Sequence, residues 1–224
     1  MPDKIILESP TDEMFRYENG FYRTASVARI SKFVTHLDIF RNISNLPGEI
    51  AECGVFKGSS LFRWIKFRSL LENPASRRVI AFDTFGKFPE ASMEGDKERR
   101  ARFVDEAGEF SLSADDIIAE LDRNNLNENI DLVAGDILQT VPEYAAAHPQ
   151  LRLALLHVDV DLYEPTKCCL EYLTPLVVKG GVIVLDDFGA FPGANKAIGE
   201  ILEAQGMAIR KMPYSNAISY VVKD

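Results

Sequence analysis

The chain has 224 residues and a formal net charge of −9, from 34 acidic and 25 basic side chains. Its apolar content of 46% suits a globular protein, and the length predicts one α/β domain over residues 1–224. The sequence has no Lys/Arg block, which argues against a nucleic-acid partner. It also has no apolar run near the ~20 residues that span a bilayer and no signal-like start, so we expect a cytoplasmic protein without membrane contact.

Residues 1–46 are expected to form an N-terminal helical segment. Residues 1–20 are polar and mixed, whereas residues 24–43 carry apolar positions at helical spacing. The Asn-Leu-Pro-Gly sequence at 45–48 ends this pattern. The helix could also pair with a second subunit, so a homo-oligomer stays an open alternative.

Short β-type runs then alternate with helical patterns, which predicts a mostly parallel sheet with helices on both faces. The expected strands cover residues 49–56, 77–85, 130–135, 151–161 and 180–188. The expected helices cover residues 59–72, 114–125, 141–147, 165–177 and 193–205. The last two runs, 207–212 and 217–222, are joined by a connection too short for a crossover, so the last strand should be antiparallel to its neighbour.

Residues 86–113 form a charged segment that is too long for an ordinary connection between a strand and a helix. We interpret it as a lid insertion over a site, with a solvated surface helix as the alternative.

The expected strand ends carry polar residues, and ligands bind at that edge of an open parallel sheet. After the first strand comes ECGVFKGSS, in which glycines allow close backbone approach and a helix start offers free N–H groups. Asp83 ends the second strand, where an acidic residue commonly accepts hydrogen bonds from a ribose. Asp136 follows the third strand, and the pattern as a whole predicts an adenosine-type cofactor.

Four aspartates follow the next two strands: Asp159, Asp161, Asp186 and Asp187. Side chains alternate along a strand, so Asp159 and Asp161 should share a face. Hard oxygen ligands in this number favour Mg²⁺, Mn²⁺ or Ca²⁺ over zinc. His157 lies one step deeper, and we interpret it as a packed core histidine, with a place at the site as the alternative.

Together, ECGVFKGSS, AFDTFGKFP, HVDVDLYEPT, GGVIVLDDFG and PGANKA resemble the macrocin O-methyltransferase (TylF-type) family. The resemblance runs from about residue 20 to the C-terminus. It implies a class I, Rossmann-like methyltransferase fold with a doubly wound seven-stranded sheet. It also implies S-adenosylmethionine and Mg²⁺ (or Mn²⁺) as cofactors, and methylation of a sugar hydroxyl on a natural product.

The resemblance further implies a role for individual residues. Asp159, Asp186 and Asp187 would hold the metal, and Asp161 would be the general base. Asp83 would bind the ribose and Asp136 would lie beside the adenine. The remaining cofactor residues would line the methionine and ribose region, namely Glu52, Gly54, Gly58, Ser59 and Ser60.

Two adjacent hydroxyls of a vicinal diol could complete the shell of such a cation. The acceptor could then be a sugar-containing small molecule or a catechol. A D-x-D sequence at a strand end also holds a metal in many glycosyltransferases, so that class is an alternative. A domain that binds a nucleoside or a cation without chemistry is a third hypothesis.

Overall fold

The computed structural model describes residues 10–224, with side chains from Met14 onward. Its centre is one sheet whose strands are β1 (Glu49–Cys53), β2 (Val79–Asp83), β3 (Ile130–Ala134), β4 (Leu153–Val158), β5 (Val177–Leu185), β6 (Arg210–Lys211) and β7 (Ser219–Val222). The strand order is β3-β2-β1-β4-β5-β7-β6. Strands β1 to β5 pair in parallel, whereas β7 is antiparallel to both β5 and β6. The predicted mostly parallel sheet with an antiparallel last strand is confirmed.

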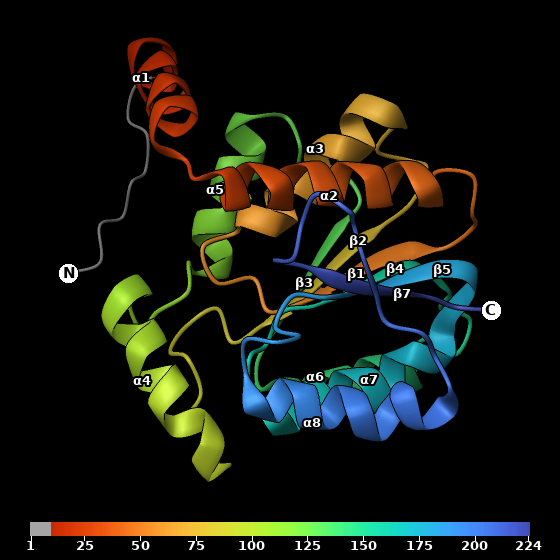
Figure 1. Ribbon diagram of the computed structural model, residues 1–224. Coiled ribbons are helices and arrows are strands. Elements are labelled where there is room, and N and C mark those ends of the chain that lie inside the picture. Colours follow the sequence, from red (N-terminus) through yellow and green to blue (C-terminus); the bar gives the residue numbers. More distant parts are fainter. Residues whose placement is uncertain (1–9) are drawn as a thin grey trace.

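Helices cover both faces of the sheet (Figure 1). One layer contains α2 (Val27–Ile43), α3 (Ser59–Leu71) and α5 (Ala114–Arg123). The other contains α6 (Ile137–Ala147), α7 (Tyr163–Leu173) and α8 (Pro192–Ile201). Two further helices, α1 (Pro10–Thr24) and α4 (Glu94–Ala107), lie toward the side where the parallel strands end (Figure 1). Short 3₁₀ turns, Thr174–Leu176 and Glu203–Gln205, follow α7 and α8.

The central strands are largely apolar because helices bury both of their faces. All six residues of β4 are buried. Its apolar side chains divide between two hydrophobic clusters, one on each face of the sheet. Leu155 packs with Trp64 on the α2–α3 side, and Leu156 packs with Leu170 on the α7 side. This double burial makes the carboxyl ends of β4 and β5 a rigid platform for the aspartates that follow them.

Helix α1 lies within the N-terminal segment that the sequence predicts to be helical, although helical spacing is evident there only over residues 24–43. Its residues were interpreted as a polar, mixed stretch, and large side chains on it remain exposed, with Phe15 at 66% and Tyr22 at 70%. From Met14 onward, α1 buries no apolar stripe against the domain, unlike a typical amphipathic surface helix. Residues 1–9 of the expected N-terminal segment lie outside the described residues. None of the helices in the described part combines the length and the apolar character needed to cross a bilayer.

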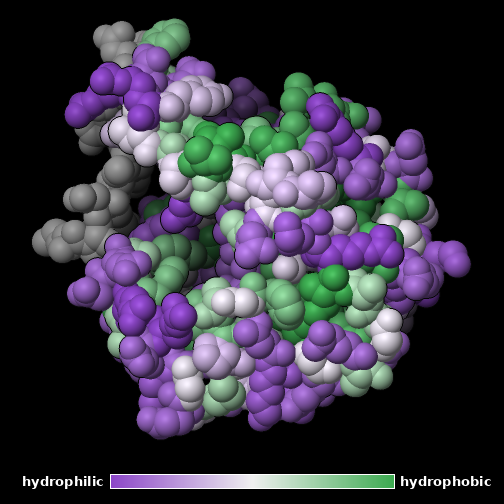
Figure 2. Space-filling model, in the orientation of Figure 1, coloured by the Kyte–Doolittle hydropathy of each residue, from purple (hydrophilic) through white to green (hydrophobic). Residues whose placement is uncertain are grey.

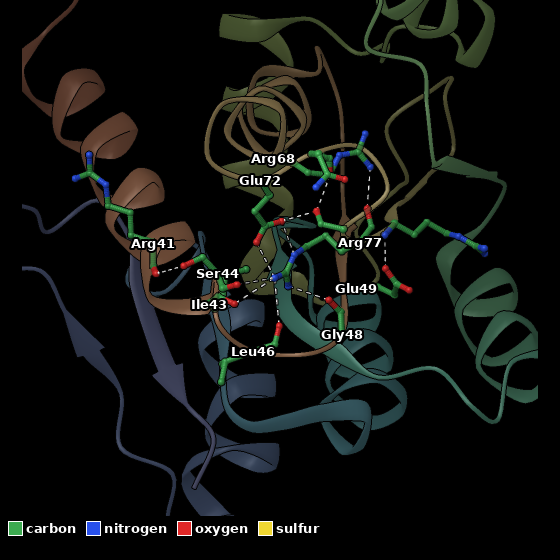
Figure 3. A network of polar contacts seen from close by, with 12 residues as sticks. Arg41, Ile43, Ser44, Leu46, Gly48, Glu49, Arg68, Glu72 and Arg77 are labelled. Atoms are coloured by element: carbon green, nitrogen blue, oxygen red, sulfur yellow. Dashed lines mark hydrogen bonds and ion pairs between the residues drawn. The ribbon is translucent and has the colours of Figure 1, made fainter.

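A buried arginine network fixes the opposite, amino-terminal edge of the sheet (Figure 3). Arg77 forms a two-point ion pair with Glu72, with nitrogen–oxygen distances of 2.8 and 2.7 Å. It also donates to the carbonyl oxygens of Leu46 and Gly48, in the turn after α2. Arg68 of α3 donates in turn to the Arg77 carbonyl oxygen at 2.9 Å. The network therefore ties α2 and α3 to the start of β2, which sets where α2 crosses the sheet.

Candidate active site

A cavity of about 970 Å³ lies at the carboxyl ends of the parallel strands. Figure 2 shows the surface hollowed between α4 and the segment that contains α1 and α2. The turns after β1, β4 and β5 form its floor, and the segment 86–113 supplies part of its wall. A ligand-sized hollow at this edge is where open α/β sheets bind their ligands.

Three carboxylates gather on the floor of the cavity. One oxygen each from Asp159, Asp161 and Asp187 lies within 4.8 Å of the other two. The close approach of β1 to β4 places Asp159, because its backbone N–H donates to the Cys53 carbonyl oxygen at 2.9 Å. Gly54 permits this approach, since a Cβ there would lie 1.7 Å from the Asp159 carbonyl oxygen. Its φ of +88° is also one that glycine adopts readily.

Asp161 is held in an unusual backbone conformation, with φ at +60°. Its backbone N–H donates to Asp187 Oδ2 at 2.8 Å, so the turns after β4 and β5 are joined directly. A non-glycine residue with positive φ is uncommon, and such strain tends to occur at functional sites. The chain thus turns sharply after Val160 and brings the Asp161 carboxylate back toward Asp159.

Burial and mutual repulsion act on all three groups. Burial, followed by the Asp159 charge, raises the pKa of Asp161 to about 7. Burial and the other aspartates also raise the pKa of Asp159 and of Asp187 well above the usual range. Clustered carboxylates of this kind are stabilised by a hard divalent cation, which prefers oxygen ligands. The donor set therefore fits Mg²⁺ or Mn²⁺.

Asp186 has different neighbours. Its Oδ2 forms an ion pair with Lys32 Nζ at 2.6 Å, and its Oδ1 lies 3.6 Å from His157 Nε2. The structure thus brings Asp159 and Asp187 of the predicted metal ligands together with the predicted base, Asp161. The third predicted ligand borders the same cavity, but its carboxylate lies against a lysine from α2.

The start of α3 forms another part of the cavity wall. Gly58 precedes the helix with φ at +78° and, having no side chain, cannot cap the first N–H groups. Ser59 and Ser60 follow it and line the cavity, as does Gly54. An uncapped helix start that faces a cavity favours an anionic group. These residues fit the carboxylate of an amino-acid moiety such as that of methionine.

Glu52 is fully buried and does not line the cavity. Ser60 Oγ donates to Glu52 Oε1 at 2.5 Å, and Oε2 has no hydrogen-bond partner among the described residues. The structure therefore places this predicted cofactor residue beneath the cavity wall, where it acts on Ser60. Direct contact with a cofactor stays a prediction that the geometry does not favour.

Asp83 lines the cavity, but its carboxylate is already engaged. Val55 N and Phe56 N donate to Oδ2 at 2.7 and 3.1 Å. Phe85 N and Ser111 Oγ donate to Oδ1 at 2.7 and 2.9 Å. These four bonds hold the turn after β1 against the segment 86–113, and they use the usual acceptor capacity of a carboxylate. Binding of a ribose by Asp83 stays a prediction.

Asp136 lies at the other end of the cavity. It caps α6, where its Oδ1 accepts from Leu138 N at 2.9 Å, and it is exposed at the cavity rim. The capping bond uses one oxygen, and the place of Asp136 beside an adenine stays a prediction.

The predicted lid segment is folded and anchored. Helix α4 occupies its middle, and Lys87 and Phe110 form an antiparallel bridge at its base. Phe103 of α4 packs on Phe56 with ring centroids 5.2 Å apart, and both rings line the cavity. The segment thus supplies an aromatic wall. Whether it opens and closes as a lid stays a prediction.

Asp96 attaches α4 to the platform below. It is fully buried, and its carboxylate accepts from Gly193 N at 2.7 Å and from Tyr163 N at 3.2 Å. These donors belong to the first turns of α8 and α7, the helices that follow the aspartate turns. A Cβ at position 193 would lie 1.9 Å from Asp96 Oδ2, so the contact requires glycine.

We expect Asp96→Ala to loosen α4, because a buried and a partly buried N–H group lose their acceptor. The loss should lower the free energy of unfolding by about 1–3 kcal/mol and speed amide hydrogen exchange in residues 94–107. Asp105→Ala, at an exposed position of the same helix, is the matched control and should change neither quantity. Unchanged exchange in α4 of the Asp96 variant would show that the helix is held by other contacts.

Some cavity residues were missed by the sequence reasoning. Lys32 and Arg63 come from the middles of α2 and α3, and Ser111 comes from the end of the segment 86–113. The local sequence around each of them predicts a helix or a loop but no functional role. No sequence signal distinguishes them from surface residues, because only the packing of these elements over the strand ends brings them to the cavity.

Comparison with known proteins places the chain in a methyltransferase family. The family model for macrocin O-methyltransferase (TylF) matches residues 25–212. A tetracenomycin-type 4'-O-methyltransferase from Streptomyces olivaceus is 30% identical over 146 residues, which are 64% of this chain and 54% of the relative. Demethyldecarbamoylnovobiocin O-methyltransferase from Streptomyces niveus is 28% identical over 161 residues, which are 70% of this chain and 59% of the relative. The chain thus spans little more than half the length of these curated relatives.

Among solved structures, the calicheamicin methyltransferase CalS11 superposes with a TM-score of 0.76 and 27% identity. The superposition covers 96% of this chain and 87% of that protein. An O-methyltransferase from Bacillus cereus, solved in complex with SAH, is 16% identical with a TM-score of 0.52 and shows likeness of fold alone. The predicted class I methyltransferase fold is confirmed.

Proposed function

Because this chain belongs to the macrocin O-methyltransferase (TylF) family, we propose that it methylates a hydroxyl of a sugar-containing small molecule, with S-adenosylmethionine as methyl donor and Mg²⁺ or Mn²⁺ as the assisting cation. The observation that carries the proposal is the trio Asp159, Asp161 and Asp187 on the floor of a ligand-sized cavity. The family match leaves the glycosyltransferase alternative without support.

The cofactor end of the cavity is proposed to lie over α3. When bound, S-adenosylmethionine supplies an electrophilic methyl group on a positively charged sulfur. The uncapped N–H groups at Ser59 and Ser60 would bind its carboxylate. Asp136 would lie toward the adenine, with Asp83 nearer the ribose. Glu52 would support this end through its hydrogen bond with Ser60.

The acceptor end is proposed to lie over the aspartates. Asp159, Asp186 and Asp187 would hold the cation, whose bound form supplies Lewis acidity toward acceptor oxygens. Asp161 would take the hydroxyl proton onto a carboxylate oxygen. A general base of this kind contributes roughly 10²–10⁴-fold to a rate. The fixed turn at Asp161 supports the proposal, because it holds the carboxylate against Asp159 before any acceptor arrives.

The acceptor class is proposed from relatives and from the cavity wall. The two Streptomyces relatives are named for methylation of a rhamnosyl tetracenomycin and of a novobiocin precursor. Here the aromatic rings of Phe56, Phe88 and Phe103 face the cavity, and flat apolar walls suit sugar rings and aglycones. A vicinal diol would offer two oxygens to one cation, so glycosides with adjacent hydroxyls are the first acceptors to test.

The test is methyl transfer from S-adenosylmethionine to a panel of vicinal-diol glycosides, read by mass spectrometry as a gain of one methyl group. We expect turnover with Mg²⁺ or Mn²⁺ and loss of turnover after EDTA treatment, restored by added cation. Full turnover in EDTA would refute the role of the cation. Tight cofactor binding without turnover on any hydroxyl would favour a non-catalytic binding protein.

A further inference from the structure

A second group of polar side chains lies behind the aspartate trio. One ring nitrogen each of His36 and His157 and one carboxylate oxygen of Asp186 lie within 4.8 Å of one another. Both histidines are fully buried, and His36 Nε2, His157 Nε2 and Asp186 Oδ1 have no hydrogen-bond partner within the described part of the chain. Two histidines and a carboxylate in this arrangement resemble a transition-metal site.

The hydrogen bonds on the far side of each ring argue against a metal here. Arg63 Nη1 lies 3.0 Å from His36 Nδ1, and Trp64 Nε1 lies 3.3 Å from His157 Nδ1. Arginine and tryptophan nitrogens only donate, so both Nδ1 atoms accept and the ring proton of each histidine resides on Nε2. A metal-ligating histidine instead donates from its other nitrogen to a carbonyl or a carboxylate.

Asp186 is therefore surrounded by donors. Lys32 Nζ lies 2.6 Å from Oδ2, and His157 Nε2 lies 3.6 Å from Oδ1. A buried carboxylate is costly unless it is paired, and this one has a cation on one side and the His157 N–H on the other. Lys32 and His157 hold the pKa of Asp186 below its usual range, although burial alone would raise it.

We propose that Lys32 and His157 are positioning residues that fix the Asp186 carboxylate, and that Lys32 competes with the divalent cation for it. The proposal rests on the proposed function, in which Asp186 is one of the cation's ligands. Lys32 comes from α2, so the competition also couples cation binding to the placement of that helix. Asp186 immediately precedes Asp187, whose carboxylate holds the Asp161 turn. A shift of Asp186 would therefore also shift Asp187 and the Asp161 turn that Asp187 holds.

The decisive variant is Lys32→Met, which keeps the length and the packing of the side chain but removes its charge. Removal of a positive charge 2.6 Å from a ligand oxygen should tighten Mg²⁺ binding on the order of tenfold, as Coulomb attraction in a partly buried site predicts. Turnover should fall by a similar factor, because Asp186 loses its fixed orientation. A purely structural role for Lys32 would not produce this combination of tighter binding and slower turnover.

Two controls accompany the experiment. Lys32→Arg keeps the positive charge, so its Mg²⁺ affinity should stay within about threefold of the wild type. A small difference is allowed because a guanidinium and an ammonium group differ in geometry. Lys66→Met removes an exposed charge on α3 and should change nothing. Binding is measured by calorimetry and by the fluorescence of Trp64, the single tryptophan of the chain, which contacts His157 directly.

Unchanged or weaker Mg²⁺ binding in Lys32→Met would overturn the proposal. Neither readout needs an acceptor or turnover, so failure of the methyl-transfer assay leaves the test intact. Should the wild type bind no Mg²⁺, the cation part of the proposed function fails. The positioning role is then decided by ¹⁵N NMR of the histidine rings. Protons on Nε2, with a His157 resonance that shifts in Lys32→Met, support it. Protons on Nδ1 alone, or no shift, overturn it.

Discussion

Asp161→Asn should lower kcat on the order of 10³-fold while leaving Mg²⁺ affinity within about twofold of the wild type. The amide has the shape of the carboxylate but cannot take a proton from the acceptor hydroxyl. Asparagine also tolerates the positive φ at this position better than most residues. The loss should therefore report chemistry and not misfolding. Steady-state turnover at saturating cofactor, with calorimetry for Mg²⁺, measures both quantities.

The matched control is Asp115→Asn, at an exposed position in the first turn of α5, which should be silent in both measurements. Two results would contradict the role of Asp161. Retention of more than a tenth of kcat would show that another group takes the proton. A loss of Mg²⁺ affinity as large as that of an Asp187 variant would make Asp161 a ligand, which the mutual distances within the trio also allow.

Asp187→Ala should weaken Mg²⁺ binding by about 100-fold or more. Even groups that only orient metal ligands typically contribute 10–100-fold, and Asp187 is proposed to touch the cation itself. The variant also leaves the Asp161 N–H without its acceptor, so excess Mg²⁺ should restore turnover only in part. Calorimetric Mg²⁺ affinity and turnover as a function of Mg²⁺ concentration check the two effects.

Asp187→Asn separates the two roles of this side chain. Its amide oxygen can still accept the hydrogen bond from Asp161 N, but it lacks the charge that a divalent cation requires. We expect this variant to keep the thermal stability of the wild type and to lose most of its Mg²⁺ affinity, whereas Asp187→Ala loses both. Wild-type Mg²⁺ affinity in Asp187→Asn would exclude Asp187 as an anionic ligand.

Helix α4 is attached to the same part of the structure as the aspartates. Asp96 of α4 binds the first turns of α7 and α8, which begin directly after the Asp161 and Asp187 turns. The aromatic wall contributed by Phe103 is thus fastened to the same platform as the proposed base and cation ligands. Substitutions that change acceptor preference are expected to lie in the segment 86–113 and in α2, since both line the cavity above the trio.

Sequence reasoning placed the aspartates at the right edge of the sheet, partly for the wrong reason. Simple alternation along a strand was expected to put Asp159 and Asp161 on one face. In the structure β4 ends at Val158, and a turn with positive φ at Asp161 brings the two carboxylates together. Alternation predicts side-chain direction only while the strand continues, and the end of a strand is set by its hydrogen-bond partners.

The partners of individual carboxylates were beyond the reach of the sequence. Asp186 and Asp187 are adjacent and look equivalent, yet one lies against Lys32 and His157 and the other joins Asp159 and Asp161. Lys32 is 154 positions away from Asp186 in the chain. Asp83 likewise matches a ribose-binding pattern, but it is occupied by backbone N–H groups of a turn that folds against it.

By itself, the sequence determined the doubly wound sheet, the antiparallel last strand and the edge at which polar residues collect. These follow from hydrophobic period, connection length and the order of elements, which are local properties of the chain. Only the tertiary structure decided which carboxylates meet, which are already paired, and that α2 brings a lysine to the site. The physical reason is that a buried charge takes its state from neighbours within a few ångströms, and packing, not sequence separation, chooses those neighbours.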